Sequence, residues 1–186
     1  MIDWFPLWLS LRVAALATFF VLTVGTLIAY LLSHKIFRGK NLVDSLITLP
    51  LVLPPTVLGY YLLVIVGRHS PFGHLYEGIF GQPLVFTWQA AVVAAFLHSA
   101  PIYIKAGRAV LETVDTRYEW AAHSLGASEW RTFWRITLPL AWRGLSSLAS
   151  LSFARSLGDF GLTIMVAGNI PGETQTLSVA IFDAVE

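Results

Sequence analysis

The chain has 186 residues, of which 56% are hydrophobic and 12% charged, with a formal net charge of +1 and a mean hydropathy of +0.68. Soluble domains usually carry about 25% charged residues, so this composition argues against an ordinary soluble domain. The sequence has no cysteine, which excludes disulfides, thiolate metal sites and cysteine nucleophiles.

Four apolar segments follow one another along the chain. We predict membrane spans at about 8–33, 45–67, 85–104 and 144–168. Each is long enough to cross roughly 30 Å of hydrocarbon, and backbone polar groups in lipid must be satisfied within a helix. The first segment is too long for a cleaved secretory signal, and its basic residues follow it instead of preceding it. We therefore predict an all-α integral membrane protein with a single transmembrane domain over residues 1–186.

Basic residues predict the orientation of these spans. They gather in the segments 34–44 and 105–143, whereas the segment 68–84 contains only Arg68. Loops rich in lysine and arginine remain on the cytoplasmic side. We expect the N-terminus and the 68–84 loop outside, and the 34–44 and 105–143 loops inside.

The large inner loop contains the stretch EWAAHSLGASEWRTFWRITLP, residues 119–139, which predicts two helices joined at a corner. Thr116 and Glu119 have the spacing of a capping box at the start of the first helix. Gly126 is expected to adopt the left-handed conformation that ends it. Ser128 would cap the second helix, which Pro139 should end or bend.

Aromatic residues are concentrated in this loop, at Trp120, Trp130, Phe133 and Trp134. One interpretation is an interfacial helix that rests on lipid headgroups. The other is a surface of aromatic anchors and arginines that enters a pocket of a partner protein. Composition alone leaves both open.

Prolines interrupt the second apolar segment at Pro50, Pro54 and Pro55. Each removes a backbone donor and clashes with the preceding turn, so we predict a kink. The kink is either a static one packed by neighbouring helices or a bend that lines a pathway.

The fourth segment contains two charged residues, Arg155 and Asp159, at i,i+4 spacing. They form either a structural ion pair or a positive site for an anion that the carboxylate moderates. Gly158 and Gly161 flank Asp159 and permit close helix approach. His98, in the third segment, is expected to be a packed, hydrogen-bonded histidine rather than a proton relay.

Two serines in the same segment, Ser152 and Ser156, could donate hydrogen bonds to an oxyanion or to carbonyls of their own helix. We expect the second arrangement for both.

The inner loop resembles a motif of ABC importer permeases. That motif is Glu-Ala-Ala, three residues, Gly, nine residues, then Ile-x-Leu-Pro, and this chain has Ala121-Ala122, Gly126 and 136–139 at the same spacing. The motif's Glu falls on Trp120, with Glu119 immediately before it. The stretches LPLVLPPTVLGYYLL (49–63) and FARSLGDFGLTIMVAGNIPGETQTL (153–177) are similar to molybdate/tungstate permeases, which are close to the sulfate/thiosulfate permeases.

The resemblance implies the helical bundle of a type I ABC importer permease, with a final span after Glu186 that this sequence does not contain. It implies that the loop docks on a cytoplasmic ATPase through Glu119, Trp120, Ala121, Ala122, Gly126, Trp130, Trp134, Ile136, Leu138 and Pro139. A pathway or gate would involve Pro50, Pro54, Pro55, Arg155, Gly158 and Asp159. The implied localisation is the bacterial inner membrane, with several spans.

The implied partners are a second permease subunit, an ABC ATPase dimer, an external oxyanion-binding protein and membrane lipid, but not nucleic acid. The permease itself would have no catalytic residue, metal site or cofactor, because the ATPase binds ATP and Mg. Moving a dianion inward against 100 mV costs about 4.6 kcal/mol. The sequence has no G-x-x-x-x-G-K-[ST] loop, so a separate ATPase must supply this energy.

Three other interpretations remain at this stage. The cargo could be sulfate or thiosulfate, since these dianions are similar to molybdate. The chain could be an ion-coupled secondary transporter, although it lacks the expected duplicated halves with broken helices. It could also be a membrane scaffold whose aromatic loop binds another protein.

Overall fold

The computed structural model describes residues 3–35 and 37–185, and every regular element within these ranges is helical. The elements in chain order are α1 (Phe5–Phe20), η1 (Val21–Gly25), α2 (Thr26–His34), α3 (Lys40–Val52), α4 (Pro55–Val66), α5 (Pro71–Phe80), α6 (Trp88–Glu112), α7 (Thr116–Ser124), α8 (Glu129–Thr132), η2 (Phe133–Thr137), α9 (Leu138–Leu157), α10 (Gly161–Ala167) and α11 (Leu177–Asp183). The elements η1 and η2 are π-helical.

Within residues 3–35 and 37–185, two helices are long and apolar enough to cross a membrane: Phe5–His34, which joins α1, η1 and α2, and Trp88–Glu112. The apolar run 45–67 is divided between α3 and α4, and the run 144–168 between α9 and α10. The break between α3 and α4 follows from two consecutive prolines. Leu53 and Pro54 each precede a proline, which disfavours the helical conformation, and both have extended backbones with ψ of 141°.

The predicted proline kink therefore lies at Leu53–Pro54. Pro50 does not end its helix, because it lies in the interior of α3. The break after α9 begins at Gly158 and leaves Asp159 outside both helices.

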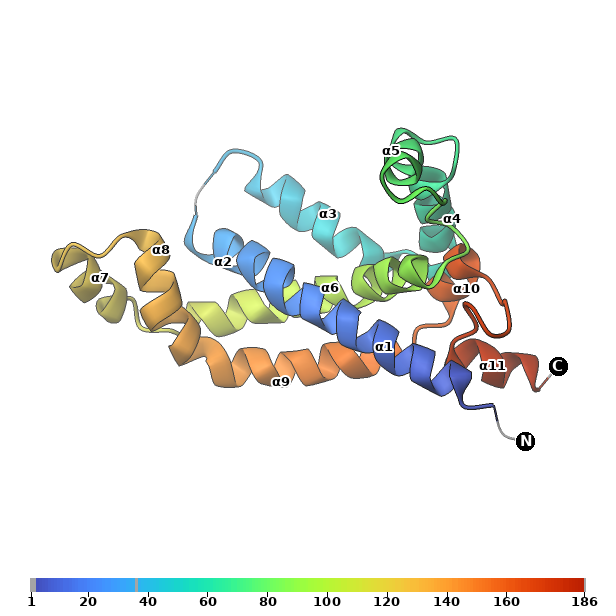
Figure 1. Cartoon of the computed structure of the whole chain (residues 1–186). Coiled ribbons are helices and arrows are strands. Elements are labelled where there is room, and N and C mark those ends of the chain that lie inside the picture. Colours follow the sequence, from blue (N-terminus) through green and yellow to red (C-terminus); the bar gives the residue numbers. More distant parts are fainter. Residues whose placement is uncertain (1–2, 36, 186) are drawn as a thin grey trace.

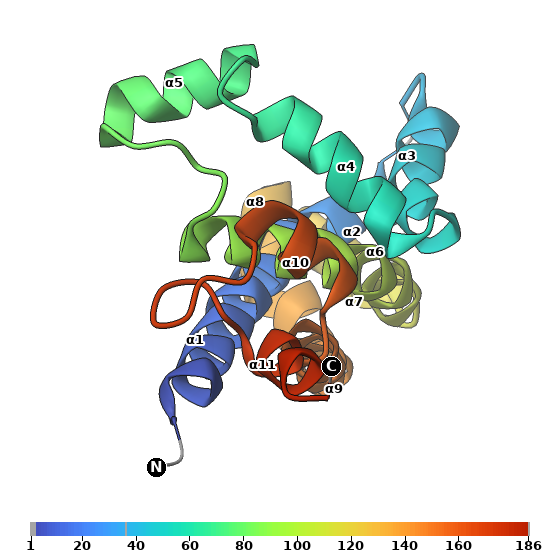
Figure 2. The same ribbon diagram turned by 90° about the vertical axis from the view of Figure 1, so that its right-hand side faces the viewer.

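The long helices α1, α6 and α9 run side by side, with α7 and α8 at one end of the molecule and both termini at the other (Figure 1). Figure 2 shows α4 and α10 next to each other, with α5 leading away from them. α6 is central, because it packs against α1, α2, α9 and α10. Its Ala90, Ala91, Ala94 and Ala95 are completely buried, which lets neighbouring helices approach closely.

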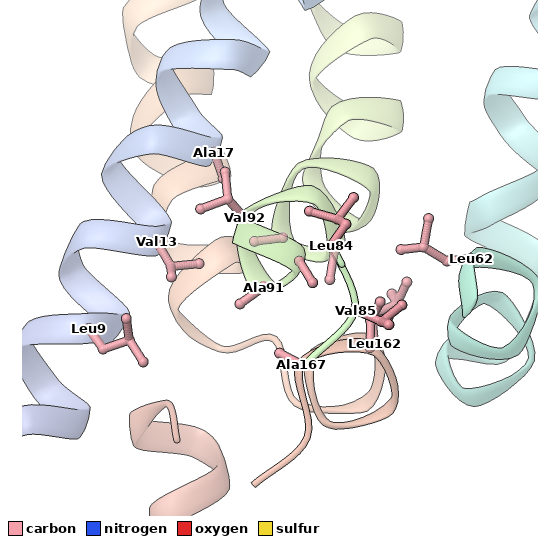
Figure 3. Packing of buried hydrophobic residues seen from close by; sticks show 14 residues of the cluster. Leu9, Val13, Ala17, Leu62, Leu84, Val85, Ala91, Val92, Leu162 and Ala167 are labelled. Atoms are coloured by element: carbon pink, nitrogen blue, oxygen red, sulfur yellow. The ribbon is translucent and has the colours of Figure 1, made fainter. Parts of the chain in front are cut away.

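Two hydrophobic clusters stabilise the bundle. The first joins α1, α4, α6 and α10 through residues such as Val13, Leu62 and Leu162 (Figure 3). The second joins α2, α6 and α9 nearer to α7 and α8, around Tyr103 and Leu145. The Tyr103 hydroxyl is 2.7 Å from that of Thr26, so this buried polar group has a partner.

Candidate functional site: the elbow and the charged cluster

The first candidate site is the elbow, residues 115–139, which contains α7, α8 and η2. Its corner is a Schellman motif: the N–H of Gly126 donates to the carbonyl of His123, and the N–H of Ala127 to that of Ala122. Gly126 has a φ of 81°, which glycine adopts without steric cost. Ser128 caps α8 by accepting from the N–H of Arg131. The predicted corner and second cap are confirmed.

The predicted capping box is wrong. Asp115, not Thr116, is the N-cap of α7, and it accepts from the N–H of Arg117. Glu119 does not reach back to the cap, because its carboxylate points toward α2 and η2. It accepts hydrogen bonds there from Thr137, at 2.6 Å, and His34, at 3.0 Å.

The second helix does not stop at Pro139. A π-helical stretch, η2, precedes this proline, and α9 then continues in a new direction (Figure 1). Pro139 lies in the first turn of α9 but inside a continuous helical run, since η2 precedes α9 directly. Because proline cannot donate a backbone hydrogen bond to the preceding turn, the regular α-helical ladder is interrupted here. The expectation of a bend thus holds, and that of a helix end does not.

The aromatic residues of the elbow do not form one surface. Trp130 and Trp134 line an apolar groove of about 470 Å³ together with Phe19 and Leu27 of the first long helix. Trp120, 68% exposed, lies on another side, beside Lys35. Phe133 was grouped with the exposed aromatics, but it is buried, with its ring centroid 4.5 Å from that of Tyr30.

A shallow apolar depression of about 430 Å³ lies between α7 and α8. The motif residues Ala121, Ala122 and Ile136 line it, and the two alanines have side chains too small to fill it. Around it lie Tyr118, Leu125, Arg131 and Arg135. Sequence reasoning missed Leu125, which is 89% exposed next to the corner. The sequence did contain a signal for it: a large apolar residue directly before Gly126, the glycine predicted to end the first loop helix, is expected to be exposed at the corner.

Ion pairs connect the segments 34–44 and 105–143. Lys35 bonds to Glu129, and this hydrogen bond holds the pKa of that exposed carboxyl below its ordinary value. On α3, Asp44 accepts from Lys105 of α6 at 2.6 Å, which lowers the pKa of Asp44. The 34–44 and 105–143 segments therefore meet at one end of the bundle.

The second candidate site is the charged cluster of Arg155, His98 and Asp159. Of the two arrangements considered for Arg155 and Asp159, the direct ion pair does not form within 4.0 Å, because α9 ends at Leu157 and the helical i,i+4 spacing no longer applies. His98 lies between them instead: its Nε2 is 3.2 Å from Nη2 of Arg155, and its Nδ1 is 3.9 Å from Oδ1 of Asp159. Since arginine only donates, His98 accepts at Nε2 and carries its proton at Nδ1.

Asp159 is buried and bonded to the start of α10. Its Oδ2 accepts from the N–H and the hydroxyl of Thr163, at 3.2 and 2.7 Å. The expectation that His98 is hydrogen-bonded is confirmed. Of the two serines, Ser152 donates to Leu148 of its own helix as expected, but Ser156 donates across to α6, to Ser99 and Ala95.

The sequence matches the family described as "Binding-protein-dependent transport system inner membrane component" over residues 21–184. The chain belongs to this family.

Members of the family with curated names are similar over nearly the whole chain. The molybdenum transport system permease protein ModB of Escherichia coli (strain K12) is 46% identical over 184 residues, which is 99% of this chain and 80% of that protein. ModB of Haemophilus influenzae is 44% identical over 96% of this chain and 78% of its own length. The sulfate transport system permease protein CysT of Escherichia coli is 35% identical over 93% of this chain and 62% of its own length.

The residues predicted to form a pathway or gate lie only partly together. Pro55 packs on Gly161, where a Cβ atom would lie 2.7 Å from that of Pro55, so α4 and α10 are in close contact. Asp159 lies two residues before Gly161 in the chain. The contact between Gly161 and Pro55 therefore brings the α3–α4 break close to the charged cluster. Pro50 lies apart within α3, and Gly158 is exposed with only its own helix nearby.

Proposed function

We propose that the chain is the transmembrane permease subunit of an ABC importer that moves molybdate or tungstate inward, driven by ATP hydrolysis in a separate subunit. The observation that carries this is the 46% identity to a molybdenum permease over 99% of the chain. The chain would span the bacterial inner membrane several times with its N-terminus outside. It would work as a homodimer among lipids, with an external binding protein, and the ATPase would bind ATP and Mg.

The elbow is proposed as the surface that docks on the ATPase. The depression between α7 and α8 supports this, because it combines exposed apolar side chains, Tyr118 and Leu125, with the guanidinium groups of Arg131 and Arg135. Aromatic and arginine side chains around an apolar centre are typical of binding hot spots. Trp120 would contact the same partner at its edge.

The groove at Trp130 and Trp134 is a separate surface in this proposal, because it is continuous with the apolar face of the first long helix. Leu125→Asp should therefore lower co-purification of the ATPase at least tenfold, with membrane insertion unchanged. Trp134→Asp is the matched control on the groove and should lower it much less. Equal co-purification of wild type and Leu125→Asp would refute docking at the depression.

The charged cluster is proposed to face the anion pathway. His98 accepts from Arg155, so the guanidinium is held in place, and among the described residues no carboxylate pairs with it directly. Conduction requires sites that bind weakly enough to release. We propose that Arg155, held by a neutral imidazole and close to the buried carboxylate of Asp159, binds an anion weakly enough to release it.

Sulfate is the second candidate cargo, since the CysT protein is 35% identical. The deciding experiment reconstitutes the full-length subunit with its ATPase and binding protein in liposomes and measures uptake of radiolabelled molybdate and sulfate. ATP-dependent molybdate uptake that excess sulfate does not inhibit supports the proposal. Uptake driven by an ion gradient without ATP would instead support a secondary transporter.

A further inference from the structure

Glu119, which immediately precedes the motif, points toward the bundle rather than toward a docking surface. Its side chain is only 12% exposed, although the next residue, Trp120, is 68% exposed. Successive residues in an α-helix point about 100° apart, so α7 directs one side toward a partner and another toward its own bundle. Glu119 is on the inward side.

One carboxylate oxygen of Glu119 joins three elements. Oε1 accepts from the hydroxyl of Thr137, the last residue of η2, at 2.6 Å. The same oxygen is 3.0 Å from Nε2 of His34, the last residue of α2. Hydrogen bonds to a charged group are stronger than neutral ones, so this is a firm connection between α7 and the ends of two long helices.

His34 is itself fixed in place. Its Nδ1 is 2.6 Å from the hydroxyl of Ser33, and its ring stacks on Tyr30 with centroids 4.5 Å apart. Tyr30 in turn contacts the buried ring of Phe133 in η2. The residues that receive Glu119 are therefore packed against each other and can move together.

Both of the connected helical runs contain a π-helical stretch. η1 lies within the first long helix, and η2 lies between α8 and α9. Such stretches have a looser hydrogen-bond ladder and often occur at functional positions. A displacement of α7 that reaches His34 and Thr137 would thus act on helices that already contain a point of adjustment.

We propose that Glu119 is a positioning residue that transmits the displacement of α7 to α2 and α9, so that ATP hydrolysis in the partner moves the spans. This proposal rests on the proposed function, because it requires that the elbow docks on an ATPase. Glu119 makes no contact with that ATPase in this mechanism. Its loss separates hydrolysis from transport without releasing the partner.

The test uses the full-length subunit, assembled with its ATPase and binding protein in liposomes. The measured quantity is molybdate imported per ATP hydrolysed. Glu119→Ala should lower this ratio at least fivefold, while ATPase co-purification and the hydrolysis rate stay within twofold of wild type. Glu119→Gln keeps an oxygen that accepts from Thr137 and should restore at least half of the ratio. Glu112→Ala is the matched control, because Glu112 is an exposed carboxylate that accepts a hydrogen bond from Arg108 of its own helix, and it should change nothing.

A wild-type ratio in Glu119→Ala would overturn the proposal, and so would loss of the ATPase, which would place Glu119 at the docking surface. If Glu119→Ala does not accumulate, Thr137→Val removes one bond at nearly constant shape and should lower the ratio at least twofold. An unchanged ratio in Thr137→Val, or failure of both variants to fold, overturns the proposal in favour of a purely structural clamp. Failure of the proposed function is distinguishable, because the wild-type subunit would then bind no ATPase.

Discussion

The contact between α4 and α10 allows a quantitative test. Gly161→Ala adds a Cβ atom that would lie 2.7 Å from the Cβ of Pro55, whereas ordinary contact begins near 3.4 Å. Both atoms are attached directly to the backbone, so neither can rotate away, and the helices must separate by about 0.7 Å. Overpacking of this kind costs about 1–3 kcal/mol. A Gly59 Cβ would meet the Cβ of Met165 at 2.6 Å, so α4 and α10 approach closely at a second position as well.

The assay is thermal unfolding of the purified subunit in detergent. A loss of 1 kcal/mol lowers Tm by about 2–4 °C in a chain of this size, so Gly161→Ala should unfold several degrees below wild type. Gly78→Ala is the control, because nothing lies within 4 Å of a Cβ at this helical position. It should keep or raise Tm, since alanine favours a helix by roughly 0.8–1 kcal/mol over glycine. A Tm of Gly161→Ala at or above that of wild type would refute the close packing of α4 on α10.

Three further predictions concern the elbow, the charged cluster and the ion pairs. Gly126→Val has free space around it, so its cost is backbone strain at φ of 81°, roughly 1–2 kcal/mol, and co-purification of the ATPase should fall because the corner changes shape. Arg155→Ala should lower uptake at least tenfold while ATPase binding persists, and loss of folding would instead favour a structural role. Asp44→Asn tests pH dependence: the Lys105 hydrogen bond lowers the pKa of Asp44 below its ordinary 3.8, so its stabilisation is present above that pH and lost as pH falls through the folded pKa. The difference in Tm between wild type and Asp44→Asn should therefore shrink below about pH 3.8, and a constant difference would contradict the pairing.

Local features were predictable because neighbouring residues decide them. Gly126 ends α7 and Ser128 caps α8 through hydrogen bonds that reach at most five residues along the chain. The apolar runs 8–33 and 85–104 predicted long helices correctly, because a span needs about 20 apolar residues, whereas the runs 45–67 and 144–168 are each divided between two helices. The resemblance in the 119–139, 49–63 and 153–177 stretches was sufficient for the family, which the match over residues 21–184 confirms.

Other expectations failed where a competing partner lies far away in the sequence. Glu119 does not close a capping box, because His34, 85 residues earlier, and Thr137 bind its carboxylate. Of the two interpretations of Arg155 and Asp159, the direct ion pair is wrong, because the helix ends between them and His98, 57 residues earlier than Arg155, lies between their side chains. A local sequence pattern cannot predict such contacts, because His34 and His98 are distant in the sequence from Glu119 and Arg155, which they contact.

The sequence by itself determined that the chain forms apolar helices with a charged, aromatic elbow on one side, because hydrophobicity, proline and glycine act over a few residues. Only the tertiary structure decided which way each elbow side chain points. It separated Trp120 from Trp130 and Trp134, buried Phe133, and turned Glu119 toward the bundle. These outcomes depend on how α7, η2 and α2 pack together, and the free energy of that packing belongs to no single segment.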